Sequence, residues 1–158
     1  MSEQFVNPNI GTLNFDEVVC EIAQEMQRDP RADYDVFVGT DSSAGGDSVD
    51  FVRAIVVHKR GKGGRYFWSR QREPKSPSLR RRIWREALLS FDLAQRLLEA
   101  LSSSTLLQFN LEIHVDIGKN GSTRELINEV VGMIVGSGFD VKIKPDAVAA
   151  TSVADKYT

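Results

Sequence analysis

Two acidic residues follow apolar runs that are typical of buried β-strands. Asp41 comes directly after residues 36–40 in the string VFVGTDSS, and Asp116 follows the alternating pattern of LEIHVDIG. A carboxylate at the mouth of a core strand is costly unless a cation or hydrogen-bond donors meet it. If the two strands are parallel neighbours, both acids lie at the carboxyl-terminal edge, where open α/β sheets place their sites. Carboxylates that close raise each other's pKa unless a cation keeps them ionised.

Two further acids occupy positions that call for a chemical explanation. Glu86 falls on the apolar stripe of a predicted helix, between Leu79 and Leu93. An acid on a core-facing stripe needs a partner, which a metal or an arginine of the string RRRIWR would supply. Asp155 lies in SVADKYT, where its spacing from Ser152 also fits a capping box that starts a short helix.

Hydrophobic periodicity predicts the elements that position these acids. Helical spacing covers residues 14–27 and about 79–101, and Ser76 or Ser78 is placed to cap the second of these helices. Strands are predicted at 34–40, 49–60, 65–71, 111–118 and 139–144, with a helix inside 120–138 and a short one at the C-terminus. This order predicts an α/β fold with a mixed five-stranded sheet. A three-stranded antiparallel meander is joined by parallel strands, helices cover both faces, and an N-terminal helix precedes the sheet.

Basic residues are concentrated in one segment of the chain. Residues 59–85 hold 11 of the 20 lysines and arginines but a single acid, Glu73. Aromatic residues at positions 66–68 are interleaved with them, a pattern that indicates contact with a nucleic-acid backbone, although a solvated charged face would give the same composition. The candidate substrate contacts are Lys62, Arg70, Arg80, Arg81, Arg82 and Arg85.

Length and composition restrict the class of protein. A chain of 158 residues with 41% hydrophobic residues can bury a core and is expected to form one globular domain. Neither a signal peptide nor a membrane span is recognisable, so we expect a cytoplasmic protein. The single cysteine, Cys20, excludes an internal disulfide framework and a multi-cysteine zinc site.

The strings that carry these acids resemble a known family. VGTDS, HVDIG, GFDVKIKPDA and SVADK are similar to the YkuK family of predicted ribonuclease H-like proteins, over nearly the whole chain from Asn14 onward. The order of the acids also resembles the D-E-D-D set of the ribonuclease H fold. The resemblance implies a ribonuclease H-like domain over residues 31–158, with residues 1–30 forming an N-terminal extension and a helix that packs on it.

The resemblance also implies a chemistry for the four acids. Asp41 would bridge two Mg²⁺ or Mn²⁺ ions, with Glu86 and Asp116 on one metal and Asp155 completing the other. Such a pair activates water and stabilises the leaving oxygen in phosphodiester hydrolysis. The expected activity is therefore a metal-dependent nuclease that acts on RNA, DNA or an RNA-DNA hybrid.

Some alternatives remain open at this level. Asp146 is a second candidate for the ligand assigned to Asp155, because the chain ends three residues after Asp155. His114 could be a ligand, but a packed or surface imidazole is the favoured interpretation. The same fold could also serve as a non-catalytic nucleic-acid-binding or protein-interaction module, since fold alone does not determine chemistry.

Overall fold

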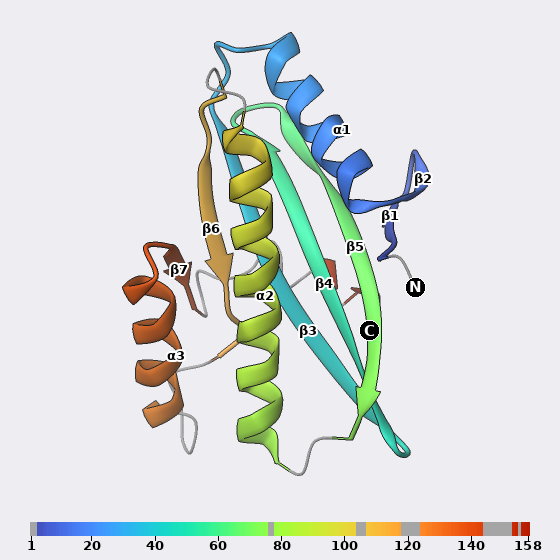
Figure 1. Cartoon of the computed structure of the whole chain (residues 1–158), viewed down its shortest axis with the longest axis vertical. Helices are drawn as coiled ribbons and strands as arrows, with labels where there is room; N and C mark the ends of the chain where they lie inside the picture. The colour runs from blue at the N-terminus through green and yellow to red at the C-terminus, as the bar shows by residue number, and fades with distance from the viewer. Residues whose placement is uncertain (1–2, 76–77, 104–106, 118–123, 144–152, 155) are drawn as a thin grey trace.

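The computed structural model contains a mixed sheet with helices packed against it (Figure 1). It describes residues 3–75, 78–103, 107–117, 124–143, 153–154 and 156–158. The elements are β1 (Phe5–Asn7), β2 (Gly11–Leu13), α1 (Phe15–Arg28), β3 (Tyr34–Gly45), β4 (Ser48–Lys59), β5 (Gly63–Pro74), α2 (Leu79–Ser102), β6 (Asn110–His114), α3 (Arg124–Gly136) and β7 (Asp140–Lys142).

The sheet has the strand order β2-β1-β5-β4-β3-β6-β7. Strands β3, β4 and β5 form the predicted antiparallel meander, and β6 and β7 add in parallel on the β3 side. The expected count of five strands is wrong, because β1 and β2 extend the sheet to seven described strands. The expectation that a helix comes first is wrong for the same reason: β1 and β2 precede α1 and pair with β5 and with each other.

Local signals explain where the first two helices begin. Asn14 caps α1 through a capping box in which its side chain accepts from the Glu17 backbone N–H, while the Glu17 carboxylate accepts from the Asn14 backbone. Ser78 caps α2 by accepting from the backbone N–H of Arg81, so Ser78 is the cap in the described structure. Because α2 is 24 residues long, it runs along the sheet and places side chains beside most of the length of β3 (Figure 1).

The β3–β4 hairpin is longer than expected. The first predicted strand ends at residue 40 and the second begins at residue 49, but β3 continues to Gly45, and its pairing with β4 persists to Gly45↔Ser48. Only Gly46 and Asp47 form the turn, where Gly46 adopts a φ of 58° that favours glycine. Asp41 therefore lies inside a strand that passes beyond the end of β6, rather than at a strand end.

The two faces of the sheet are covered differently. Helices α1, α2 and α3 lie on one face and share a single apolar cluster with the sheet (Figure 1). On the other face, Ala154 packs on Val52 and Ala54, and the ring of Tyr157 stacks on Trp68 at a centroid distance of 4.3 Å. The described C-terminal residues are thus attached to the face of β4 and β5 that the three helices leave uncovered.

No helix in the described part of the chain is both long enough and apolar enough to cross a membrane.

Candidate functional site

Asp41 and Asp116 come from two parallel, adjacent strands, as the sequence predicts. The parallel pairing of β3 with β6 runs as far as Gly39↔His114. Each aspartate stands two residues beyond this last pair, so continuing the same register brings Asp116 to the level of Asp41. One carboxylate oxygen of Asp116 is buried. A short turn follows β6, in which the backbone N–H of Ile117 donates to the carbonyl of Val115.

Glu86 reaches the same region from α2. Its carboxylate accepts a hydrogen bond of 2.9 Å from the hydroxyl of Ser42, one residue beyond Asp41 on β3. Burial of the carboxyl group raises the pKa of Glu86 to about 8, and the nearby charges of Asp41 and Asp116 add to this rise. The hydrogen bond from Ser42 and the charge of Arg82 act in the opposite direction without cancelling it. Three carboxylates from three elements therefore influence one another.

The rest of the expected ligand set is outside the described residues. Asp155 and its alternative Asp146 both belong to this undescribed part. Within the ranges that the structure describes, no group of three or more His, Cys, Asp and Glu side chains is close enough together to hold a metal ion. Asp41, Glu86 and Asp116 are thus electrostatic neighbours, but they are not drawn into a closed ligand cluster.

The side chains of Asp41, Glu86 and Asp116 are nevertheless of the type that binds divalent metal ions. Carboxylate oxygens are the ligands that Mg²⁺ and Mn²⁺ prefer. The raised pKa of Glu86 shows that its ionised form is disfavoured beside the other two acids, and a cation would reverse that preference. Asp41, Glu86 and Asp116 are the described residues that would hold it.

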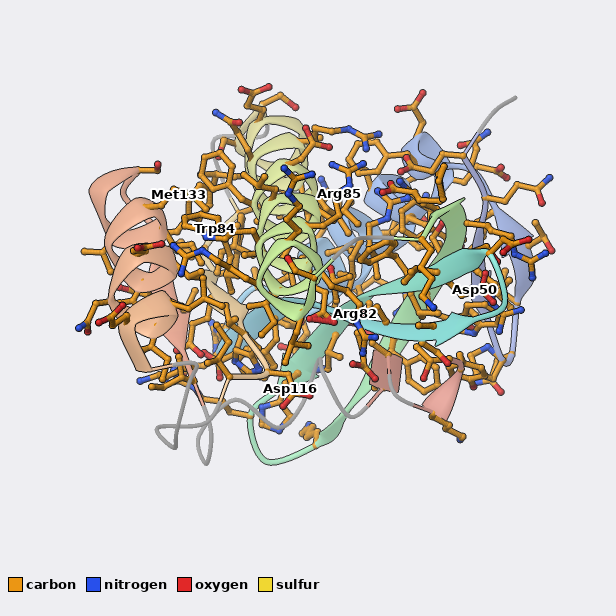
Figure 2. The ribbon with its side chains drawn as sticks, turned by 90° about the horizontal axis from the view of Figure 1, so that it is seen from below. Asp50, Arg82, Trp84, Arg85, Asp116 and Met133 are labelled. Atoms are coloured by element: carbon orange, nitrogen blue, oxygen red, sulfur yellow. The ribbon has the colours of Figure 1, made fainter. Side chains whose placement is uncertain are left out.

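The four candidate arginines at the start of α2 differ in their surroundings. Arg80 pairs with Glu129 at 2.5 Å, and Arg85 pairs with Glu73 at 2.6 Å. Arg82 contributes a favourable charge to Glu86, and Figure 2, which views the molecule from the end where α2 begins, shows Arg82 and Asp116 beside that end of the helix. Arg81 is exposed. The structure therefore places Arg82 near the carboxylates, whereas Arg80 and Arg85 pair with other acids.

The other two candidate substrate residues lie elsewhere. Lys62 is in the β4–β5 turn, where its charge acts on Asp29 just after α1, at the opposite end of the sheet from the start of α2 (Figure 1). Arg70 on β5 donates to the carbonyl of Tyr157, and its guanidinium lies 5.6 Å from the centroid of the Trp68 ring. The basic segment is continuous in sequence, but folding divides it among different surfaces.

His114 is packed in the structure. It is 4% exposed, and its ring stacks on Phe37 at a centroid distance of 4.6 Å. Burial lowers its pKa, while a contact of 3.2 Å from Nε2 to Glu112 acts to raise it. These contacts give the imidazole a structural environment at the end of β6.

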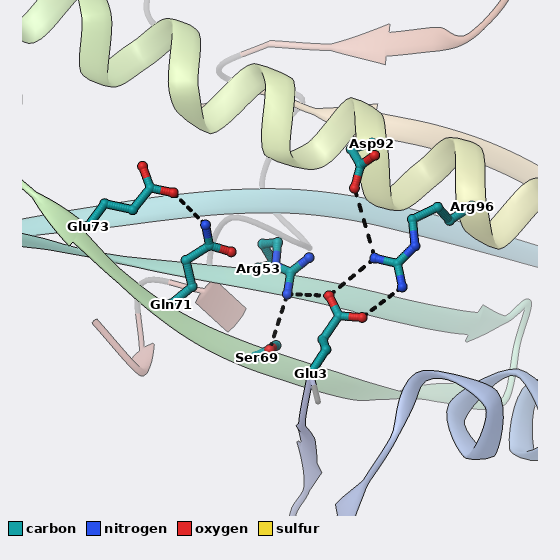
Figure 3. Close-up of polar contacts among 7 residues, drawn as sticks. All are labelled: Glu3, Arg53, Ser69, Gln71, Glu73, Asp92 and Arg96. Carbon is teal, nitrogen blue, oxygen red and sulfur yellow. Dashed lines mark hydrogen bonds and ion pairs between the residues drawn. The ribbon is translucent and has the colours of Figure 1, made fainter. Parts of the chain in front are cut away.

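Two features of the charged face were missed from the sequence. Ser42 contacts Glu86, and strand alternation would have placed it toward α2 had β3 been expected to continue past Thr40. A cluster of Glu3, Arg53 and Arg96 also joins the N-terminal segment to β4 and α2 (Figure 3). Its members are far apart in the sequence, so no local pattern indicates it.

Comparisons with known proteins agree with the fold. The family model described as Ribonuclease H-like matches residues 17–158. The Bacillus subtilis (strain 168) protein named "Uncharacterized protein YkuK" is 34% identical over 168 residues, which cover 98% of this chain and 96% of that protein. No solved structure gives a significant match. Because the family model covers most of the chain, the chain belongs to the ribonuclease H-like family, and YkuK is one of its relatives.

Proposed function

We propose that this protein is a divalent-metal-dependent nuclease that hydrolyses phosphodiester bonds in RNA, DNA or an RNA-DNA hybrid. The observation that carries the proposal is the position of Glu86 near Asp41 and Asp116: burial raises the pKa of Glu86 to about 8, and the charges of the two aspartates add to this rise. A protein has little reason to place three acids together without a cation to balance them. Ribonuclease H-like proteins generally use divalent metals, and this supports the same choice.

In the proposed site, Asp41, Glu86 and Asp116 hold Mg²⁺ or Mn²⁺, with Asp155 as the fourth ligand and Asp146 as its alternative. When bound, the metal pair supplies an activated water and stabilises the leaving oxygen of the cleaved strand. Glu86 must give up its proton for the cation to bind, since a protonated carboxyl is a poor ligand. Metal binding is therefore expected to release a proton below about pH 8.

Two described neighbours of Glu86 assist this step. The hydroxyl of Ser42 donates a hydrogen bond to Glu86 Oε2. This hydrogen bond favours the ionised form of Glu86 and fixes the position of one carboxylate oxygen. The positive charge of Arg82 also favours the ionised form. These two contacts do not overcome the effect of burial, so Glu86 stays protonated at neutral pH in the metal-free protein. They favour the ionised ligand, but a cation is still needed to ionise it.

The arginines at the start of α2 are the proposed contacts for the nucleic-acid backbone. Arg81 and Arg82 would bind phosphates beside the carboxylates, and Arg80 and Arg85 would exchange their exposed partners Glu129 and Glu73 for phosphate oxygens. A shared role for Lys62 is not favoured, because it lies at the other end of the sheet. Arg70 lies on β5, where it contacts Tyr157 and the ring of Trp68.

The decisive experiment is a calorimetric titration of Mn²⁺ into the wild type, Asp41→Asn and Asp116→Asn. The control variant is Asp47→Asn, which removes the same charge from the exposed β3–β4 turn. We expect the wild type and the control to bind and both site variants to lose at least about tenfold in affinity. Equal binding by all four proteins would overturn the proposed site.

A cleavage assay then separates the nuclease from a non-catalytic module. Single strands, duplexes and hybrids are incubated with Mg²⁺ or Mn²⁺ and with the wild type or Asp41→Asn. Cleavage by the wild type alone supports the proposal. Tight, salt-dependent binding by both proteins without cleavage would identify a nucleic-acid-binding module that keeps the fold.

A further inference from the structure

A cavity of about 850 Å³ lies beside β5, and none of the three carboxylates lines it. Its lining consists of Glu3, Gln4, Arg53 and the β5 residues 69–72. Because side chains alternate along a strand, Ser69 and Gln71 come from one face of β5, and Arg70 and Arg72 come from the other. The cavity therefore curves around the edge of the sheet and collects arginines from both sides.

The inner end of this cavity already binds a carboxylate. Glu3 Oε2 lies 2.5 Å from Nη2 of Arg53, and Glu3 Oε1 lies 2.8 Å from Nη2 of Arg96 on α2 (Figure 3). A second nitrogen of Arg96 donates to Glu3 Oε2 at 3.2 Å. Two guanidinium groups thus surround one monovalent anion, an arrangement that suits the oxygens of a doubly charged anion at least as well.

The positive charge in the cavity is only partly balanced. Arg53 is 5% exposed, and its Nε is buried without a hydrogen-bond partner among the described residues. Arg70 donates to a neutral carbonyl, that of Tyr157, and forms no ion pair with a described carboxylate. Arg72 has an exposed partner in Asp50 at 2.9 Å. An arginine buried this deeply normally has its donors satisfied, so the spare donor and the unpaired charge indicate a ligand.

We propose that this cavity is a binding site for a phosphate group and that the carboxylate of Glu3 occupies its inner end when no phosphate is present. Arg53 and Arg96 bind the oxygens of the phosphate in place of the Glu3 carboxylate, and Ser69 and Gln71, which share one face of β5, offer neutral hydrogen bonds. Free phosphate and the terminal phosphate of a nucleic-acid strand share this chemistry. The site uses none of the three carboxylates, so it does not depend on the proposed nuclease activity.

The test is a calorimetric titration of inorganic phosphate, with a chelator present and ionic strength held constant with chloride. We expect weak saturable binding to the wild type and about tenfold tighter binding to Glu3→Gln, because the competing carboxylate is gone. Arg96→Gln removes one of the two guanidinium groups that bind the phosphate, and it is expected to weaken binding about tenfold in both backgrounds.

Glu21→Gln is the matched control, because Glu21 also accepts from an arginine, Arg65, at 3.2 Å but lies outside this cavity. Its phosphate affinity should equal that of the wild type. Absence of saturable binding in both the wild type and Glu3→Gln would overturn the proposal. An equal gain in Glu3→Gln and Glu21→Gln would also overturn it, because the effect would then be one of net charge.

A second arm identifies the source of the phosphate. An oligonucleotide with a 5′-phosphate and the same oligonucleotide without it are titrated under metal-free conditions into Glu3→Gln and into Glu3→Gln with Arg96→Gln. A preference for the phosphorylated strand that Arg96→Gln removes identifies a strand terminus as the ligand. Binding of inorganic phosphate without such a preference identifies free phosphate, and either result supports the site.

Discussion

Two glutamates on the same face of the sheet have pKa values shifted in opposite directions. Burial raises the pKa of Glu86 to about 8, with Asp41 and Asp116 adding to it. Burial also acts to raise the pKa of Glu3, but hydrogen bonds and charges from Arg96 and Arg53 outweigh it, and the pKa lies below its ordinary value. Loss of water is common to both sites. The difference is the sign of the neighbouring charges.

The comparison distinguishes a completed site from an incomplete one. Around Glu3 the chain itself provides the cations, so the carboxylate contributes to stability without any ligand. Around Glu86 the described chain provides two acids, a hydroxyl and one more distant arginine. The first arrangement is expected to be stable as it stands, whereas the second is expected to gain most of its stability when a divalent cation binds.

The largest expected effect comes from Asp41→Asn. Loss of a metal ligand should reduce cleavage by at least about 10³-fold, equivalent to about 4 kcal/mol of transition-state stabilisation. In the metal-free protein the same substitution should raise the melting temperature above about pH 8, where Glu86 is ionised and Asp41 repels it. Cleavage assays and thermal unfolding with a chelator measure the two effects, with Asp47→Asn as the control. Unchanged cleavage would remove Asp41 from the site.

The next effect concerns the completed site. Arg53→Met leaves Glu3 with one cation instead of two in a buried position, and it should cost about 3 kcal/mol in the free energy of unfolding. The matched control is Arg72→Met, which breaks the exposed pair with Asp50 and should change the free energy of unfolding far less. Urea unfolding compares the two variants. Similar losses would show that the buried cluster has no special importance.

A smaller effect is expected in the pH dependence of stability. Since the pKa of Glu86 rises from 4.5 to about 8 on folding, the native state binds the extra proton between these values. Stability from this group is complete below pH 4.5 and is lost as the pH rises to about 8. The expected loss in the free energy of unfolding is about 2 kcal/mol when partial exposure of Glu86 is taken into account. The metal-free Glu86→Gln variant should not show this loss. Parallel pH profiles in the two proteins would contradict it.

Glu3 should show the opposite pH response. Its lowered pKa means that its contribution is present above the ordinary pKa of a glutamate and is lost as the pH falls through the folded value. The difference in the free energy of unfolding between the wild type and Glu3→Gln should therefore shrink as the pH falls, whereas the contribution of Glu86 shrinks as the pH rises. One series of unfolding curves over pH checks the sign of both pKa shifts.

The smallest effect is predicted for Ser42→Ala. Losing the hydroxyl removes the hydrogen bond that favours ionised Glu86, so the pKa of Glu86 should rise further and the alkaline end of its pH profile should move upward. The cost in stability at high pH is about 1 kcal/mol. Ser43→Ala, an exposed neighbour on the other side of β3, should leave the profile unchanged. A shift of equal size in both variants would exclude a specific role for Ser42.

The sequence predicted those parts of the fold that have local signals. The cap of α2 was narrowed to Ser76 or Ser78, and Ser78 is the one observed, because capping depends on residues within one turn. The parallel pairing of β3 and β6 was stated as a condition, and the structure fulfils it. Strands β1 and β2 were missed because three residues each are too few to establish a period.

The three described acids of the proposed site were recognisable in the sequence, but their supporting contacts were not. Asp41, Glu86 and Asp116 each contradict an apolar pattern, which made them visible. The contact from Ser42 was hidden because the serine and glycine residues after Asp41 are typical of a turn, whereas cross-strand pairing with β4 holds them in a strand. The pair of Arg96 with Glu3 joins residues 93 positions apart, a separation at which only the folded structure reveals a contact.

The stacking of Tyr157 on Trp68 gives this protein an intrinsic fluorescent reporter. The chain has two tryptophans, Trp68 on β5 and Trp84 on α2, so Trp84→Phe leaves the emission to Trp68 alone. Detachment of the C-terminal residues would expose the Trp68 ring to water, shift its emission to longer wavelength and remove quenching by its neighbours. Attachment of the segment that contains Asp155 can thus be followed in real time and without a label.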